Sequence, residues 1–83
     1  MDIYAEMEKK VYNLRDEIIN SIKSVLNDKG YGIGSRCVTP YTGHTFSIES
    51  DRLLINNYHT DNISTDDLLS YLRAAIHVLP NEH

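Results

Sequence analysis

The stretch of sequence that decides the fold covers residues 2–28 and reads DIYAEMEKKVYNLRDEIINSIKSVLND. It contains neither proline nor glycine, and its apolar residues recur at steps of three or four. They are Ile3, Met7, Val11, Leu14, Ile18, Ile22 and Val25. Because a helix has about 3.6 residues per turn, this spacing places them on one helical face, which must be buried. The sequence therefore predicts a long N-terminal helix over residues 1–29.

The length of this helix bears on the state of assembly. Gly30 is in the usual position of a left-handed C-cap, with Lys29 beside the negative end of the helix dipole. The helix would be about 40 Å long, whereas a compact domain of this size is about 30 Å across. The apolar face therefore extends beyond what the rest of the chain can cover. We predict a homodimer whose helix-to-helix interface contains Ile3, Met7, Val11 and Leu14.

Residues 35–57 have the alternation and the turn residues of a three-stranded antiparallel meander. The expected strands are residues 35–39, 44–49 and 52–57, and residues 58–62 are expected to form a loop. A two-residue turn at Ser50-Asp51 sets the register of the second hairpin. This register pairs Glu49 with Arg52, Ile48 with Leu53, Phe46 with Ile55 and His44 with Asn57. It directs the four apolar residues of these pairs to one face and leaves Leu54 on the other, more polar face.

A second helix is predicted over residues 64–79. Ser64 fits the N-cap, Asp66 and Asp67 lie in the positive first turn, and Pro80 stops the helix. Its buried face is expected to hold Leu68, Leu69, Leu72, Ala75, Ile76 and Leu79, and residues 81–83 are expected to be a mobile tail. The fold class is thus α+β, a single αβββα domain with both helices on one face of the sheet.

This order of elements is also that of double-stranded-RNA-binding domains. Members of that family bind phosphates with a basic start to the last helix, whereas this chain has Thr65-Asp66-Asp67 there. The resemblance therefore covers the order of elements alone, and it does not predict RNA binding.

Composition narrows the classes of function. The chain has 83 residues, enough for one domain, and a formal net charge of −4 with no basic cluster. Nonspecific binding to nucleic acid therefore lacks its electrostatic driving force. A single cysteine excludes an internal disulfide and suits a reducing compartment. The acidic start and the lack of a long apolar run predict a cytoplasmic protein that has no signal peptide and does not enter membranes.

No residue pattern predicts catalysis, a metal or a cofactor. The four histidines have no metal-ligand spacing, His59 and Asp61 suit a solvated turn, and Cys37 suits the core. Residues 30–36 read GYGIGSR, but a helix precedes them and strand-like residues follow, which is the reverse of a dinucleotide-binding fingerprint. Six tyrosines against one phenylalanine are typical of surfaces with one apolar and one wet side. The residues that could contact a ligand or partner are Tyr31, Arg36, Tyr41, His44, Leu54 and Tyr58.

These observations favour a binding protein over an enzyme. The leading hypothesis is a small regulatory or inhibitory accessory protein that acts by protein–protein interaction, of the kind that phages and other mobile elements often carry. The alternative is a protein that binds a small ligand or nucleotide through residues 30–36.

Overall fold

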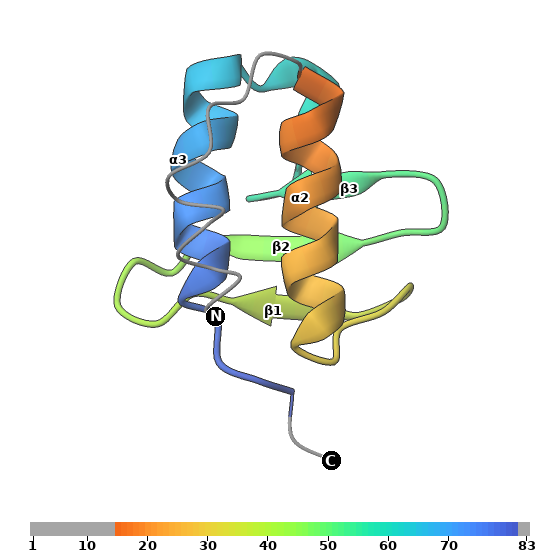
Figure 1. Ribbon diagram of the computed structural model, residues 1–83, viewed down its shortest axis with the longest axis vertical. Helices are drawn as coiled ribbons and strands as arrows, with labels where there is room; N and C mark the ends of the chain where they lie inside the picture. The colour runs from red at the N-terminus through yellow and green to blue at the C-terminus, as the bar shows by residue number, and fades with distance from the viewer. Residues whose placement is uncertain (1–14, 82–83) are drawn as a thin grey trace.

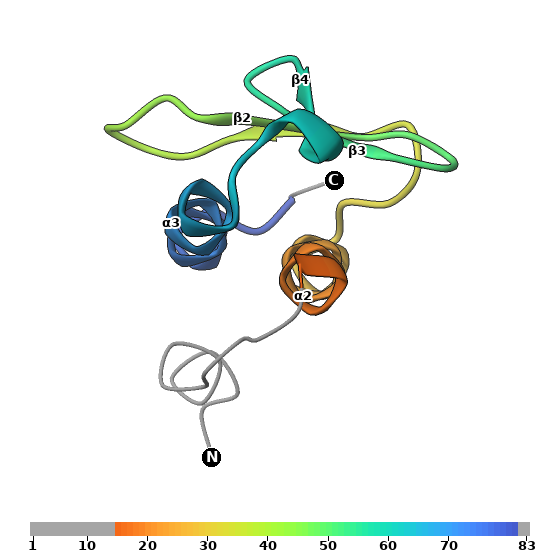
Figure 2. The same ribbon diagram turned by 90° about the horizontal axis from the view of Figure 1, so that it is seen from above.

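The computed structural model describes residues 15–81, which form an antiparallel sheet covered on one face by two helices (Figures 1 and 2). Residues 1–14 and 82–83 lie outside the described part. Figure 2 shows both helices on the same side of the sheet, and Figure 1 shows them side by side, running in the same direction across the strands. The elements are α2 (Arg15–Asp28), β1 (Arg36–Val38), β2 (Thr45–Ile48), β3 (Leu53–Ile55), β4 (Tyr58–His59), the short 3-10 helix η1 (Thr60–Asn62) and α3 (Thr65–Ile76). The α+β class and the placement of both helices on one face are confirmed.

Helix α2 buries the apolar face that its spacing predicts. Ile18, Ile22 and Val25 are fully buried, and the adjacent Ile19 and Leu26 are buried with them. These side chains form one core with residues of α3 and of the inner face of the sheet. The contact between α2 and α3 is the most extensive between any two described elements. The predicted interface residues Ile3, Met7, Val11 and Leu14 lie outside the described residues.

The end of α2 is held by its own cap and by the chain that follows α3. Gly30 has a φ of 95°, and its N–H donates to the Asn27 carbonyl at 3.0 Å. Lys29 Nζ donates to the Val78 carbonyl at 2.6 Å. Asn81 donates its backbone N–H to the Lys29 carbonyl at 2.8 Å and its side-chain amide to the Gly30 carbonyl at 3.0 Å. The expectation of a mobile tail from residue 81 is therefore wrong for Asn81, because two hydrogen bonds anchor it.

The sheet has four antiparallel strands in the order β1-β2-β3-β4. Its central register is the predicted one, with Phe46 opposite Ile55 and Ile48 opposite Leu53. Glu49 also faces Arg52, with its N–H donating to the Arg52 carbonyl at 2.9 Å and an ion pair at 3.5 Å. The four apolar residues of the central register are buried against the helices together with Cys37, which confirms the predicted inner face.

The third strand predicted over residues 52–57 is present as β3, but its predicted end at residue 57 and the loop predicted after it are wrong. Strand β3 ends at Ile55, and Asn56 and Asn57 have φ values of 53° and 70°, as a two-residue type I′ turn requires. The chain then reverses into β4, so Ile55 pairs with Tyr58. Asparagine is one of the few residues other than glycine that adopt positive φ readily.

The predicted pairing of His44 with Asn57 is wrong for the same reason. The Asn56 side chain faces His44 instead, and its Oδ1 accepts the backbone N–H of Thr45 at 3.0 Å. With its carbonyl oxygen engaged in this way, Asn56 donates from Nδ2 to His44 Nδ1 at 3.2 Å. This assigns the ring hydrogen of neutral His44 to Nε2.

Helix α3 begins as predicted and ends one turn early. Asp67 donates its N–H to Ser64 Oγ at 3.2 Å, which confirms Ser64 as the N-cap. The helix ends at Ile76, His77 is the C-cap, and Val78 is buried while Leu79 is 66% exposed. The predicted end at Leu79 is wrong because Pro80 excludes its preceding residue from the helical region, so the last turn tightens before it.

The turn at Asn56 gives a test of the fourth strand. Asn56→Ala places a Cβ-bearing residue without polar contacts at positive φ, and we expect it to lower the free energy of unfolding by about 2 kcal/mol. Asn56→Gly loses the same side-chain hydrogen bonds but tolerates the backbone, so it should cost about half as much. Urea denaturation measures both values. Equal losses would show that positive φ at this position is not required.

Candidate functional site

Figure 2 shows that one face of the sheet turns away from the helices. The strand register places a row of residues from all four strands on this face. Arg36 pairs with Ser47, Ser47 with Leu54, and Leu54 with His59, so these four residues follow one another across the sheet. Val38 lies on the same face, opposite Thr45, and is 56% exposed. The predicted position of Leu54 on this face is confirmed. The face combines the apolar surface of Val38 with the cation Arg36 at its β1 side.

Strand β1 is an edge of the sheet whose backbone groups alternate in direction. Ser35 accepts the Ile48 N–H at 2.9 Å and Thr39 donates to the His44 carbonyl at 2.8 Å, so residues 35 and 39 face β2. In an antiparallel ladder the residues between them alternate, which directs the N–H and C=O groups of Arg36 and Val38 outward. Within residues 15–81 no backbone hydrogen bond reaches these outward groups. A groove of about 350 Å³ lies here, lined by Arg36, Cys37, Val38 and Thr45. We call these residues and their outward backbone groups the β1 edge.

A second groove lies between the last turns of α2, the glycine-containing connector and the β2–β3 hairpin. It encloses about 380 Å³, and its lining includes Lys23, Asn27, Tyr31, Gly32, Ile33 and Glu49. Tyr31 is oriented by a hydrogen bond from its hydroxyl to the Leu79 carbonyl at 2.9 Å. Loss of hydration raises the pKa of the Tyr31 hydroxyl, and electrostatic repulsion from Cys37 raises it further by a smaller amount. We call this cavity the helix-end groove, and it contains part of the segment 30–36.

A third groove lies between the β1–β2 loop and α3. It encloses about 370 Å³ and is lined by Thr39, Pro40, Tyr41, Thr42, Ala74 and His77. Tyr41 has a φ of 68° and a fully exposed side chain. The hydroxyls of Thr39 and Thr42 lie 2.6 Å apart and close the loop beneath it. Positive φ at a bulky residue costs backbone energy, which the hydrogen bonds of this loop offset.

The structure distributes the predicted contact residues over separate regions of the surface. Tyr31 lines the helix-end groove, Tyr41 lines the groove beside α3, and Arg36 belongs to the β1 edge. His44 packs edge-on against Tyr71, with ring centroids 5.2 Å apart. Tyr58 lies on β4 and is 65% exposed. Only Arg36 and Leu54 share one surface, the open face of the sheet.

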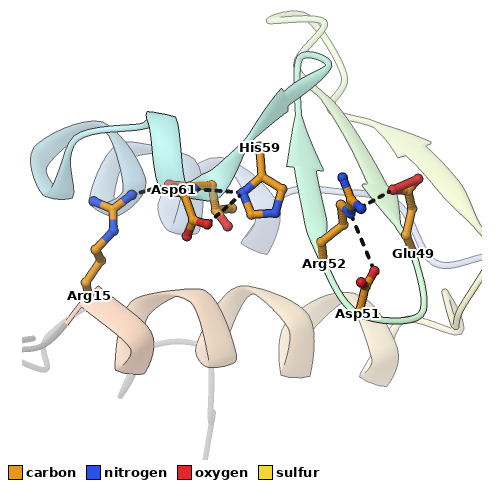
Figure 3. A network of polar contacts seen from close by, with 7 residues as sticks. Arg15, Glu49, Asp51, Arg52, His59 and Asp61 are labelled. Atoms are coloured by element: carbon orange, nitrogen blue, oxygen red, sulfur yellow. Dashed lines mark hydrogen bonds and ion pairs between the residues drawn. The ribbon is translucent and has the colours of Figure 1, made fainter.

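Two clusters of polar contacts lie beside the sheet (Figure 3). Arg15 at the start of α2 donates to the Thr60 carbonyl of η1. His59 Nδ1 accepts the Asp61 N–H at 3.1 Å and so caps η1, with the Asp61 carboxylate 3.3 Å away. At the tip of the β2–β3 hairpin, Arg52 contacts Glu49 and Asp51. Among the described residues, no group of three His, Cys, Asp or Glu side chains could hold a metal ion.

Cys37 is a core residue, as its position in the predicted meander indicates. Its side chain is 7% exposed and faces the helices opposite Phe46. Burial raises the pKa of its thiol from 9.0 to about 11. Since the thiolate is the nucleophilic form, the thiol is unreactive at neutral pH.

The sequence analysis did not identify Val38 or the outward backbone groups of β1 as a surface. The sequence gives little indication of this surface, because a strand of three residues does not reveal whether it lies at the edge or in the middle of a sheet. The fourth strand had a clearer signal, the Asn56-Asn57 pair between the apolar Ile55 and the aromatic Tyr58.

Comparison with protein-family models, with curated proteins and with solved structures finds no match to this chain. No helix within residues 15–81 is both long enough and apolar enough to cross a membrane.

The raised pKa of Cys37 predicts a specific dependence of stability on pH. Above pH 9 the unfolded chain releases the thiol proton and the folded chain keeps it until about pH 11. Wild type should therefore lose stability relative to Cys37→Ala by about 1.4 kcal/mol per pH unit between these values. Below pH 9 the difference between the two proteins should be constant. A difference that stays constant up to pH 11, measured by urea denaturation, would contradict the burial of this thiol.

Proposed function

We propose that this protein acts by binding other proteins, as a small regulatory or inhibitory accessory protein of the cytoplasm. The observation that supports this most directly is the one-sided sheet. Both helices cover one face (Figure 2), while the other face carries the exposed Arg36 and Val38 and the partly exposed Leu54. Exposed apolar surface rimmed by polar side chains is typical of protein-binding sites.

The proposal includes a homodimer formed through a long N-terminal helix over residues 1–29. Its support is the sequence, because Ile3, Met7, Val11 and Leu14 continue the spacing of the residues that α2 buries. A helix whose apolar face exceeds its own domain is stabilised by packing against a second helix.

Solution mass by light scattering tests the dimer. We expect a dimer for wild type and a folded monomer for Met7→Asp, because a charge on the shared apolar face must be desolvated. Lys9→Asp is the control, since it places the same charge on the polar side of the same helix. A monomeric wild type at micromolar concentration, or a Lys9→Asp variant that dissociates equally, would overturn the dimer.

A small ligand bound in the helix-end groove is the second candidate. The groove has a volume of about 380 Å³, which lies within the range of small-molecule sites, and it is lined by Lys23, Tyr31 and the backbone of Gly32. A phosphate or nucleotide would suit the lysine and the close approach that Gly32 allows.

Thermal denaturation with inorganic phosphate or a nucleotide tests the second candidate. A ligand at a hundred times its Kd should stabilise the fold by about 2.7 kcal/mol and raise Tm, and Lys23→Ala should reduce this rise. An unchanged Tm in wild type would exclude the ligands tested from this groove.

A further inference from the structure

We propose that the β1 edge takes up an extended segment of the partner protein as a fifth strand, with a carboxylate side chain opposite Arg36 and an apolar side chain opposite Val38. This inference rests on the proposed function, because it specifies how a protein partner would bind. The occupant is thus an acidic peptide in extended conformation.

The backbone of β1 provides the directional part of this recognition. The hydrogen bonds of Ser35 and Thr39 to β2 direct two N–H and two C=O groups, those of Arg36 and Val38, away from the sheet. Such groups are the template on which an added strand forms its ladder. Beside these groups, on the open face, lies a groove of about 350 Å³ lined by Arg36, Cys37, Val38 and Thr45.

The two side chains of the edge specify the sequence of the added strand. Arg36 and Val38 lie two residues apart on the open face, so their counterparts on the added strand are also two residues apart. Arg36 is the sole Asp, Glu, Lys or Arg between Lys29 and Glu49, and it forms no ion pair within residues 15–81. A carboxylate opposite it would therefore meet a cation that no neighbouring acid neutralises, and Val38 would contribute its exposed apolar surface.

The same charge argues against a second copy of this chain as the occupant. Antiparallel pairing of two β1 strands about Cys37 would place Arg36 opposite the partner's Val38, and both guanidinium groups would lie diagonally on one face of the joined sheet. Two like charges on neighbouring strands of one face repel each other. Arg36 thus disfavours pairing between copies and favours an acidic strand.

Titration of the full chain with two short peptides, followed by the amide NMR spectrum, tests the inference. The peptides share an alternating Val/Thr background and differ only in Glu or Lys at the position intended to face Arg36. We expect the Glu peptide to bind at least about threefold more tightly than the Lys peptide, with the largest shifts at the amides of Arg36 and Val38. Arg36→Glu should reverse this preference.

Two variants at residue 38 test the backbone contribution. Val38→Pro removes an outward N–H that β2 does not use, so we expect a folded protein that binds the Glu peptide about fivefold more weakly, the equivalent of one hydrogen bond. Val38→Ile is the matched control, because it keeps the N–H, the β-branched shape and the apolar surface, and its binding should stay close to that of wild type.

Three results would overturn the inference. They are the absence of binding by either peptide, shifts that avoid the β1 edge, and shifts at Arg36 and Val38 that depend on protein concentration without peptide. The last would identify a second copy as the occupant. Light scattering on the same samples tests the proposed homodimer separately. If the protein is a dimer but binds neither peptide, the proposal of an added fifth strand is wrong and the proposed dimer still holds.

Discussion

The packing of α2 against α3 on one face of the sheet is the interaction on which the rest of the structure depends. The two helices run in the same direction, so their positive ends meet at one end of the molecule and their negative ends at the other (Figure 1). The like partial charges that meet at each end repel each other, which disfavours this arrangement. Charged side chains offset this at both ends. The first turns of the two helices contain the acids Asp16, Glu17, Asp66 and Asp67, and at the other end Lys29 donates to the Val78 carbonyl just after α3.

The parallel arrangement of the two helices also determines the path of the chain through the sheet and which face of the sheet is buried. The meander must carry the chain from the end of α2 back to the level at which α2 began, and four short antiparallel strands accomplish this. The inner face is filled by Phe46, Ile48, Leu53 and Ile55, so the sheet makes its contribution to stability there. The outer face and the outward side of β1 are not part of this core, so substitutions at Arg36 or Val38 should leave the core undisturbed.

Features set by short-range pattern were predictable from the sequence. The register of Phe46 with Ile55 followed from a two-residue turn, and the cap at Ser64 followed from its position before the apolar run of α3. The fourth strand was missed because Asn56 and Asn57 were interpreted as the end of a strand, although their tolerance of positive φ suits a turn. Leu79 was predicted to lie in the core, but Val78 lies there instead, because Pro80 tightens the last turn of the helix. The location of the β1 edge depends on how distant segments assemble, which local periodicity does not encode.

The tail that follows α3 has a kinetic consequence. Its hydrogen bonds to Lys29, Gly30 and Tyr31 join residues 48 to 52 positions apart, whereas the hairpins join near neighbours in sequence. Closing so long a loop carries an entropic cost that only the assembled core can offset, so we expect these bonds to form late in folding. Interactions absent from the folding transition state slow unfolding and leave the folding rate almost unchanged. Asn81 and Tyr31 should therefore govern the lifetime of the native state, while the hairpins govern how quickly it is reached.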